Sequence, residues 1–148
     1  MKNNENHIFI DTNCLMNYFV EKYHLYKTAS TDNADALRFL FGLNGKKLYV
    51  SSLSIAQITA KLQKYIGAET MIKEIANFIH RYNIIEFNEQ DIKQAISAKL
   101  AKDIEDLYQY EMSQKVKCFY IMTNNIKDFS SLANIVAFTP KKVRKIIF

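Results

Sequence analysis

Acidic side chains lie at three places in the sequence where a predicted strand ends or a predicted helix begins. Asp11 directly follows a short apolar stretch that predicts a buried strand, and Asp128 follows another such stretch after a few polar residues. Asp103 and Asp106 begin a predicted helix and, being three residues apart, share one of its faces. In an open parallel sheet, ligands gather beyond the carboxyl ends of the strands. We therefore expect Asp11, Asp106 and Asp128 to share one acidic pocket, with Asp103 beside it.

Carboxylates that are crowded into a poorly solvated pocket cannot all stay ionised unless a cation compensates their charge. Oxygen ligands select hard ions, so Mg²⁺ or Mn²⁺ fits such a pocket better than zinc. A divalent ion held in this way can activate water and stabilise the charge that develops on a phosphodiester. Each acid also has an ordinary interpretation: Asp11 and Asp103 as helix N-caps, Asp106 as a solvated first-turn acid, and Asp128 as a turn residue. Their joint placement favours the metal site.

Strand and helix patterns alternate along the chain, and no linker divides it. Strands are predicted at about residues 7–10, 48–50, 84–87, 118–122 and 135–138. Helices are predicted at about residues 14–23, 32–44, 52–66, 70–82, 88–100 and 104–114, with a last one after Thr139-Pro140. Ser52 or Ser54 is the expected N-cap of the helix at residues 52–66. This alternation predicts a three-layer α/β/α fold with a central, mainly parallel sheet. We expect a single domain over residues 1–148.

The composition is that of an ordinary globular protein. Its 148 residues include 49% hydrophobic and 24% charged side chains, and 20 basic against 15 acidic residues leave a net charge of +5. A chain of this length buries about two-thirds of its unfolded surface, so it needs no metal or disulfide in order to fold. The positive charge is compatible with a polyanionic partner without establishing one.

The sequence argues against several functional classes. Its 3 glycines lack the spacing of a Walker A or Rossmann phosphate loop. Cys14 and Cys118 form no CxxC pair, and with 3 scattered histidines there is no zinc spacing. Two cysteines suit a reducing compartment, where we expect both to be buried. No segment has the pattern of a signal peptide or the apolar length of a membrane span, so we expect a cytoplasmic protein that does not contact a membrane.

Three blocks of the sequence, taken in order, resemble the PIN-domain ribonucleases. Residues 8–13 (Ile-Phe-Ile-Asp-Thr-Asn) look like the opening strand and DTN signature of that family. Residues 103–107 (Asp-Ile-Glu-Asp-Leu) resemble the D-F-E-D-A/L stretch of a bacterial subgroup, and residues 123–129 resemble its T-x-N-x-x-D-F stretch. The later Phe138-Thr139-Pro140 is similar to the closing segment of the subgroup. The likeness covers nearly the whole chain.

This resemblance implies a sheet in the order 3-2-1-4-5 and a divalent-metal-dependent endoribonuclease that hydrolyses RNA phosphodiester bonds. It implies Mg²⁺ or Mn²⁺ as the cofactor, held by catalytic carboxylates of Asp11, Asp106 and Asp128. Hydrogen bonds from Asn13 and Thr123 would orient these carboxylates, and Asp103 and Asn125 would support them. Many small bacterial members are VapC-type toxins, which are dimeric and inhibited by an antitoxin. RNA, an antitoxin protein and a second copy of this chain are therefore the expected partners.

One position departs from the family pattern. The helix after the second strand normally carries a glutamate, and the stretch from Val50 to Ile58 places Gln57 there. Glutamine keeps a carbonyl oxygen that could bind a metal but removes a charge, so the metal would bind more weakly. The protein could then be a slow nuclease, could rely on Asp103 instead, or could be a PIN-like module that binds RNA or protein. Sequence alone leaves these alternatives open.

A third functional class, a phosphotransfer domain, fits the sequence poorly. A phosphatase of the haloacid-dehalogenase type needs a D-x-D motif, which Asp11-Thr12-Asn13 does not supply. A receiver domain needs an acidic pair after its first strand, where only Asp11 is present. The basic residues near the carboxyl end could contact RNA phosphates without sequence preference, the alternative being a solvated terminal helix. They are Lys141, Lys142, Arg144 and Lys145.

Overall fold

The computed structural model of the protein describes residues 3–25, 31–98 and 103–147, and its centre is one five-stranded parallel sheet. The strands are β1 (Asn4–Ile10), β2 (Lys47–Ser51), β3 (Asn83–Ile85), β4 (Cys118–Met122) and β5 (Val136–Phe138). Their spatial order is β3-β2-β1-β4-β5, and every neighbouring pair is parallel. The fold class and the strand order expected from the sequence are thus confirmed.

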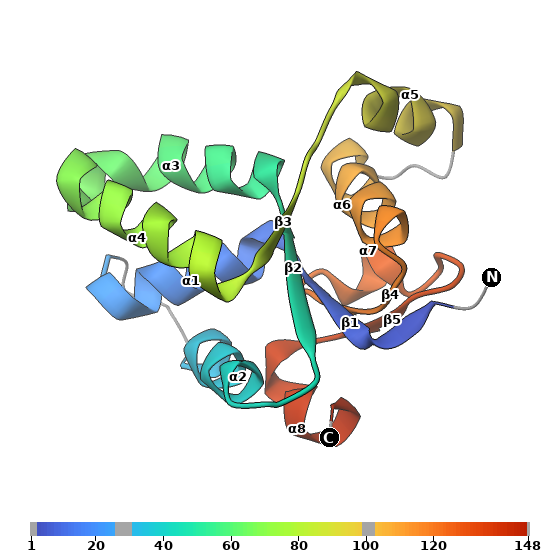
Figure 1. Ribbon diagram of the computed structural model, residues 1–148, viewed down its shortest axis with the longest axis horizontal. Coiled ribbons are helices and arrows are strands. Elements are labelled where there is room, and N and C mark those ends of the chain that lie inside the picture. Colours follow the sequence, from blue (N-terminus) through green and yellow to red (C-terminus); the bar gives the residue numbers. More distant parts are fainter. Residues whose placement is uncertain (1–2, 26–30, 99–102, 148) are drawn as a thin grey trace.

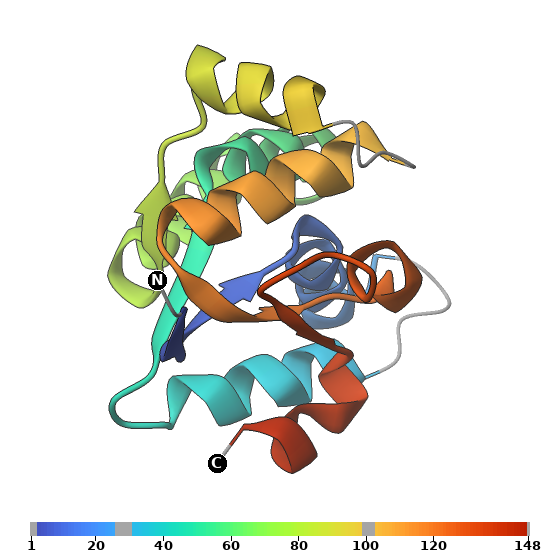
Figure 2. The same cartoon turned by 90° about the vertical axis from the view of Figure 1, so that its right-hand side faces the viewer.

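Helices cover both faces of this sheet, which gives the predicted three layers (Figure 1). They are α1 (Thr12–Tyr23), α2 (Asp32–Phe41), α3 (Ser52–Ile66), α4 (Ala68–Arg81), α5 (Glu89–Ala98), α6 (Ile104–Lys115), α7 (Ile126–Phe129), the 3-10 turn η1 (Pro140–Lys142) and α8 (Val143–Ile146). Helices α1 to α4 lie on one side of the sheet, whereas α5, α6 and α7 lie on the other. In Figure 2, α5 lies outside α6, and α8 lies beside α2.

The two sides of β1 belong to two separate hydrophobic clusters. Ile8 and Ile10 pack into the cluster that includes helices α1 to α4 and α8. Phe9 points the other way, into the cluster that includes α6 and α7. All three side chains are fully buried, because a parallel sheet covered on both faces leaves neither side of a central strand in water. This burial fixes the position of the carboxyl end of β1, where Asp11 follows.

The strand ends and helix starts differ from the sequence expectation in a few places. We predicted Ser52 or Ser54 as the N-cap of α3, but the cap is Ser51, whose Oγ accepts a hydrogen bond from the Leu53 amide at 3.0 Å. The third strand ends two residues earlier than predicted, because the amide of Phe87 donates to Ser52 Oγ at 2.9 Å and so leaves the sheet. The short helix α7, which carries Asp128, was not predicted.

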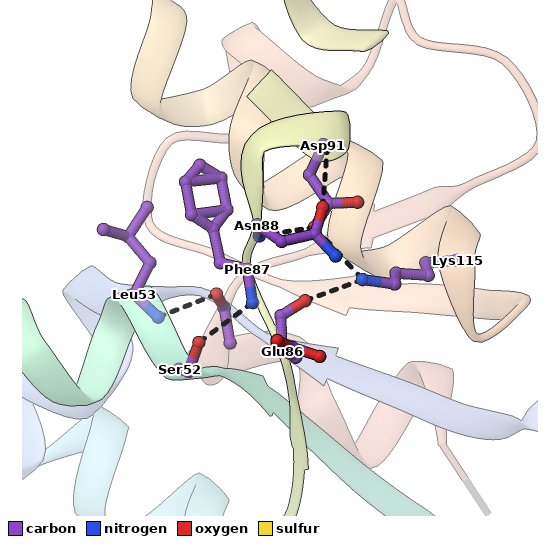
Figure 3. A network of polar contacts seen from close by, with 8 residues as sticks. Ser52, Leu53, Glu86, Phe87, Asn88, Asp91 and Lys115 are labelled. Atoms are coloured by element: carbon purple, nitrogen blue, oxygen red, sulfur yellow. Dashed lines mark hydrogen bonds and ion pairs between the residues drawn. The ribbon is translucent and has the colours of Figure 1, made fainter. Parts of the chain in front are cut away.

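The segment between β3 and α5 is held by a network of polar contacts (Figure 3). Asn88 and Asp91 cap the start of α5 reciprocally, with hydrogen bonds of 2.8 and 3.2 Å between the side chain of each and the backbone of the other. Lys115, at the end of α6, donates to the backbone oxygen of Glu86 at 2.7 Å and to Asp91 Oδ2 at 3.1 Å. The network therefore ties this segment to α6, the helix that carries Asp106.

Two expectations about the wider context can be compared with the structure. Cys14 and Cys118 are free thiols and are fully buried, as predicted. Among the described residues, no helix combines the length and the apolar character that a membrane span requires.

Candidate active site

A pocket of about 220 Å³ opens at the carboxyl ends of the central strands. Side chains from α1, α3, α6 and the segment after β4 line it: Asp11, Thr12, Asn13, Met16, Asn17, Gln57, Lys61, Asp103, Glu105, Asp106, Gln109 and Asn125. Most site residues expected from the sequence are thus in one place. Asp128 is not on the cavity surface, but its carboxyl group contacts that of Asp106.

Asp11 is fixed at the floor of the pocket by hydrogen bonds from three directions. Its carboxylate accepts from the Thr12 amide at 2.8 Å, from Asn13 Nδ2 at 2.8 Å and from Thr123 Oγ1 at 2.7 Å. These bonds favour the ionised form, but burial of a side chain that is only 2% exposed outweighs them and raises the pKa of Asp11 to about 6. Asp11 is thus an N-cap of α1 and also a buried acid, and Asn13 and Thr123 orient it as the resemblance implies.

Asp106 has the most perturbed pKa in the pocket. Burial is the largest cause, followed by the contact with Asp128 and by the charges of Asp11, Asp103 and Asp128, and together they raise the pKa of Asp106 to about 8. Its Oδ2 atom is buried and has no hydrogen-bond partner in the described part of the chain. Asp106 is therefore not a solvated first-turn acid, since its surroundings favour a neutral group or a carboxylate with a bound cation.

Asp103 and Asn125 hold neighbouring backbone in place. Asp103 is exposed and caps α6, because its Oδ1 accepts from the amides of Glu105 at 2.8 Å and Asp106 at 3.2 Å. The Asn125 amide donates to Thr123 Oγ1 at 2.9 Å, and this hydroxyl in turn donates to Asp11. The hydrogen bonds of Asp103 are those of an ordinary N-cap, while its charge adds to the acidity of the pocket.

The carboxylate and amide oxygens that line this pocket are suitable ligands for a hard divalent cation. Within residues 3–25, 31–98 and 103–147, no three His, Cys, Asp or Glu side chains lie close enough together to form a ready-made metal cluster. Mg²⁺, however, is usually held by one or two carboxylates and completes its shell with water and substrate phosphate. The Asp106–Asp128 pair, with its unpartnered oxygen and with Asp11 nearby, fits that requirement.

Gln57 faces the pocket through a network of neutral polar side chains. Thr12 Oγ1 donates to Gln57 Oε1 at 3.1 Å and lies 2.6 Å from Ser54 Oγ. Gln109 Nε2 donates to the hydroxyls of Thr12 at 2.7 Å and Ser54 at 3.2 Å. Gln109 is 2% exposed, and its Oε1 has no partner among the described residues. The alignment that puts Gln57 at the family's glutamate position therefore places this side chain at the pocket.

The basic residues near the carboxyl end lie elsewhere. Lys141 and Arg144 line a separate cavity that they share with Asp32 and Asp35 of α2. The Arg144 guanidinium stacks on Phe39 at 4.4 Å from the ring centroid. Lys142 and Lys145 are exposed. None of the four lines the acidic pocket, and contact of these residues with RNA stays a prediction.

Sequence reasoning missed two pocket residues that a helical pattern could have found. Lys61 lies four residues after Gln57 on α3, and Gln109 lies three residues after Asp106 on α6, so each shares a helix face with a residue that was singled out. Neither belongs to the motifs quoted above. Spacing of three or four residues along a helix from a candidate site residue would therefore have identified both.

No known protein-family profile matches the chain. Ribonuclease VapC1 of Aquifex aeolicus strain VF5 is 29% identical over 132 residues, which cover 86% of this chain and 87% of the relative. The VapBC-1 structure from nontypeable Haemophilus influenzae matches 92% of this chain and 99% of the solved chain, with a TM-score of 0.65 and 20% identity. A toxin–antitoxin complex from Klebsiella pneumoniae matches 90% of this chain and 97% of the solved chain, with a TM-score of 0.65 and 18% identity.

The parallel order 3-2-1-4-5 and the acidic pocket at its carboxyl end define a PIN-type α/β/α fold, the fold shared with these solved structures. Within this class, the similarity to the Aquifex protein over most of both chains supports a PIN domain of the VapC type. The likeness to VapC-type PIN domains that the sequence indicates is thus supported by a relative that matches most of the chain.

Proposed function

We propose that this chain is a divalent-metal-dependent endoribonuclease, the toxin of a toxin–antitoxin pair. The observation that carries the proposal is the contact between carboxyl groups of α6 and α7, with the charge of the acid that follows β1 acting on the same pair. Asp106 contacts Asp128, feels the charge of Asp11 and keeps one buried carboxyl oxygen without a partner. The name of the Aquifex relative, a ribonuclease, supports RNA as the substrate.

Asp106, Asp128 and Asp11 would hold the cation. Bound Mg²⁺ or Mn²⁺ would supply Lewis acidity toward a phosphate oxygen and water. The protein's own part is to keep Asp11 in one orientation through Asn13 and Thr123. In the reaction, water adds to phosphorus, the bond from phosphorus to the 3′ oxygen breaks, and that oxygen takes a proton. The products are a 5′-phosphate and a 3′-hydroxyl.

Water is the expected nucleophile because no histidine lines the pocket to serve as acid or base for attack by the ribose 2′-hydroxyl. The solved structures of VapBC-1 and of the Klebsiella toxin–antitoxin complex support an antitoxin as the protein partner of this chain. A homodimer, by contrast, is proposed only from the sequence resemblance. Function in the cytoplasm likewise follows from the reducing compartment that two free thiols suit.

The second candidate is a PIN-like module that binds RNA or protein and cleaves slowly or not at all. Gln57 is the observation that favours it, because a neutral amide stands where the family carries a carboxylate. Activity measurements on the wild type separate the two candidates.

The decisive experiment uses end-labelled single-stranded RNAs of varied sequence with Mn²⁺. We expect cleavage that leaves a 5′-phosphate, stops with EDTA and is lost in Asp11→Asn. This variant keeps one side-chain oxygen, which can accept the bonds that Asn13 and Thr123 make to Oδ2 but not also the bond that the Thr12 amide makes to Oδ1. The exposed Asp35→Asn is the matched control and should cleave like the wild type. A 2′,3′-cyclic phosphate, or cleavage that survives EDTA and Asp11→Asn, would refute the mechanism. Complete inactivity of the pure wild type would favour the binding module.

A further inference from the structure

The pocket has a second side whose chemistry is opposite to that of its acids. Gln57 and Lys61 stand one turn apart on α3, and both line the pocket that the acids of α6 also line. Lys61 is exposed and forms no ion pair with any residue that the structure describes. A cationic side chain next to an acidic pocket is thus left free to bind an anion.

The direction of the hydrogen bonds around Thr12 decides what Gln57 presents to the pocket. A threonine hydroxyl has one hydrogen and two lone pairs. Thr12 Oγ1 accepts from Gln109 Nε2 and donates its hydrogen to Gln57 Oε1, which leaves its second lone pair for the Ser54 hydroxyl. Gln109 Nε2 also donates to Ser54 Oγ at 3.2 Å.

The side-chain carbonyl oxygen of Gln57 therefore accepts the hydrogen bond from Thr12, whereas its amide nitrogen is not engaged. Gln57 Nε2 makes no hydrogen bond to any other residue within 3–25, 31–98 and 103–147. An NH₂ group without a partner is a hydrogen-bond donor, which suits an anion and not a cation. The exchange of glutamate for glutamine thus changes the charge preference of this side of the pocket.

We propose that Gln57 Nε2 and Lys61 Nζ form a phosphate-binding subsite for RNA that lies across the pocket. The two groups hold a non-bridging oxygen of a backbone phosphate next to the carboxylates of Asp11 and Asp106. The subsite is a binding and positioning device, and it rests on the proposed action of this protein on RNA. Phosphate contacts of this kind contribute affinity that does not depend on sequence and that salt weakens.

The test measures binding of a fluorescent single-stranded RNA in EDTA, where neither metal nor cleavage contributes. Lys61→Gln should weaken binding about fivefold at low salt and reduce the slope of log affinity against log salt by about 0.7, the loss of one phosphate contact. Gln57→Glu should weaken binding at least as much, because it replaces a donor with a negative charge. Lys73→Gln, which removes the same charge from an exposed site on α4, is the control and should stay close to the wild type.

Kinetics with Mn²⁺ give a second readout, in which Lys61→Gln should raise KM and leave kcat nearly unchanged. If the wild type binds and cleaves RNA but Lys61→Gln behaves like Lys73→Gln in both measurements, the subsite is wrong and the proposed function stands. If the wild type neither binds nor cleaves RNA, both the phosphate-binding subsite and the proposed ribonuclease function are wrong. The melting temperature of each variant should stay near that of the wild type. This control shows that a change in binding does not come from unfolding.

Discussion

Replacement of Asp106 by asparagine should make the metal-free protein more stable. The pKa of Asp106 rises from 3.8 to about 8, so at neutral pH folding must protonate a carboxylate that is ionised in the unfolded chain. At about 1.4 kcal/mol per pKa unit, this cost is at most about 4 kcal/mol at pH 7. Because the pocket opens to water and the proton is shared with Asp128, we halve it to about 2 kcal/mol. Asparagine carries no such cost, and its amide can donate to Asp128.

For a chain of this size, about 2 kcal/mol corresponds to a melting temperature about 7 °C higher, which calorimetry in EDTA at pH 7 measures directly. The control is Asp35→Asn, which changes an exposed carboxyl group that pairs with Arg38 on the surface and should shift stability by less than about 0.5 kcal/mol. A melting temperature of Asp106→Asn that equals or falls below that of the wild type would refute the claim that crowded carboxylates strain this pocket.

Bound metal should make the wild type melt at a higher temperature than Asp106→Asn, the reverse of their order in EDTA. A ligand that binds only the folded state stabilises it by about 2.7 kcal/mol when its concentration is 100 times the dissociation constant. Millimolar Mn²⁺ should therefore raise the melting temperature of the wild type, and Asp106→Asn should lose that response because it lacks one carboxylate of the pair with Asp128. An equal Mn²⁺ response of both proteins would mean that the ion binds somewhere else.

Two further predictions concern the same pocket. Gln57→Glu should tighten Mn²⁺ binding in calorimetric titration, because one carboxylate oxygen can keep the bond from Thr12 while the other faces the cation, and no gain over the wild type would contradict the alignment at this position. The metal-free wild type should also lose stability between about pH 4 and about pH 8. The raised pKa values of Asp11 and Asp106 give a stabilisation that is complete only below the unfolded pKa of 3.8 and is lost as pH rises through about 6 and about 8. Thermal melts in EDTA check this trend, and Asp106→Asn should flatten its upper part.

The layers and most of the pocket could be predicted because they depend on patterns local to the sequence, whereas the strand order was implied by the resemblance to the PIN-domain ribonucleases. An apolar stretch that ends in Asp-Thr-Asn marks both the end of a strand and the start of a helix, so Asp11 could be placed without knowledge of its neighbours. The strand Cys118–Met122 was predicted with its observed bounds, since all five residues are apolar or aromatic. Parallel strands then bring their carboxyl ends together.

What could not be predicted depends on contacts between distant segments. The choice of Ser51 over Ser52 as the cap of α3 follows from the bond that Ser52 makes with Phe87, 35 residues later in the chain. Helix α7 has only 4 residues, too few for a periodic pattern. The orientation of Gln57 depends on Thr12 and Gln109, which come from two other helices.

The orientation of Gln57 also changes how its departure from the family should be interpreted. A glutamine whose carbonyl faced the acids would be a weakened copy of a glutamate, and the pocket would simply have lost a charge. With its carbonyl bonded to Thr12, the side chain presents a donor instead, and Lys61 stands one turn further along α3. Under the two proposals, the acids of α6 and α7 bind a cation and the α3 side chains bind an anion. RNA phosphate together with a divalent ion satisfies both, so each should bind more tightly in the presence of the other.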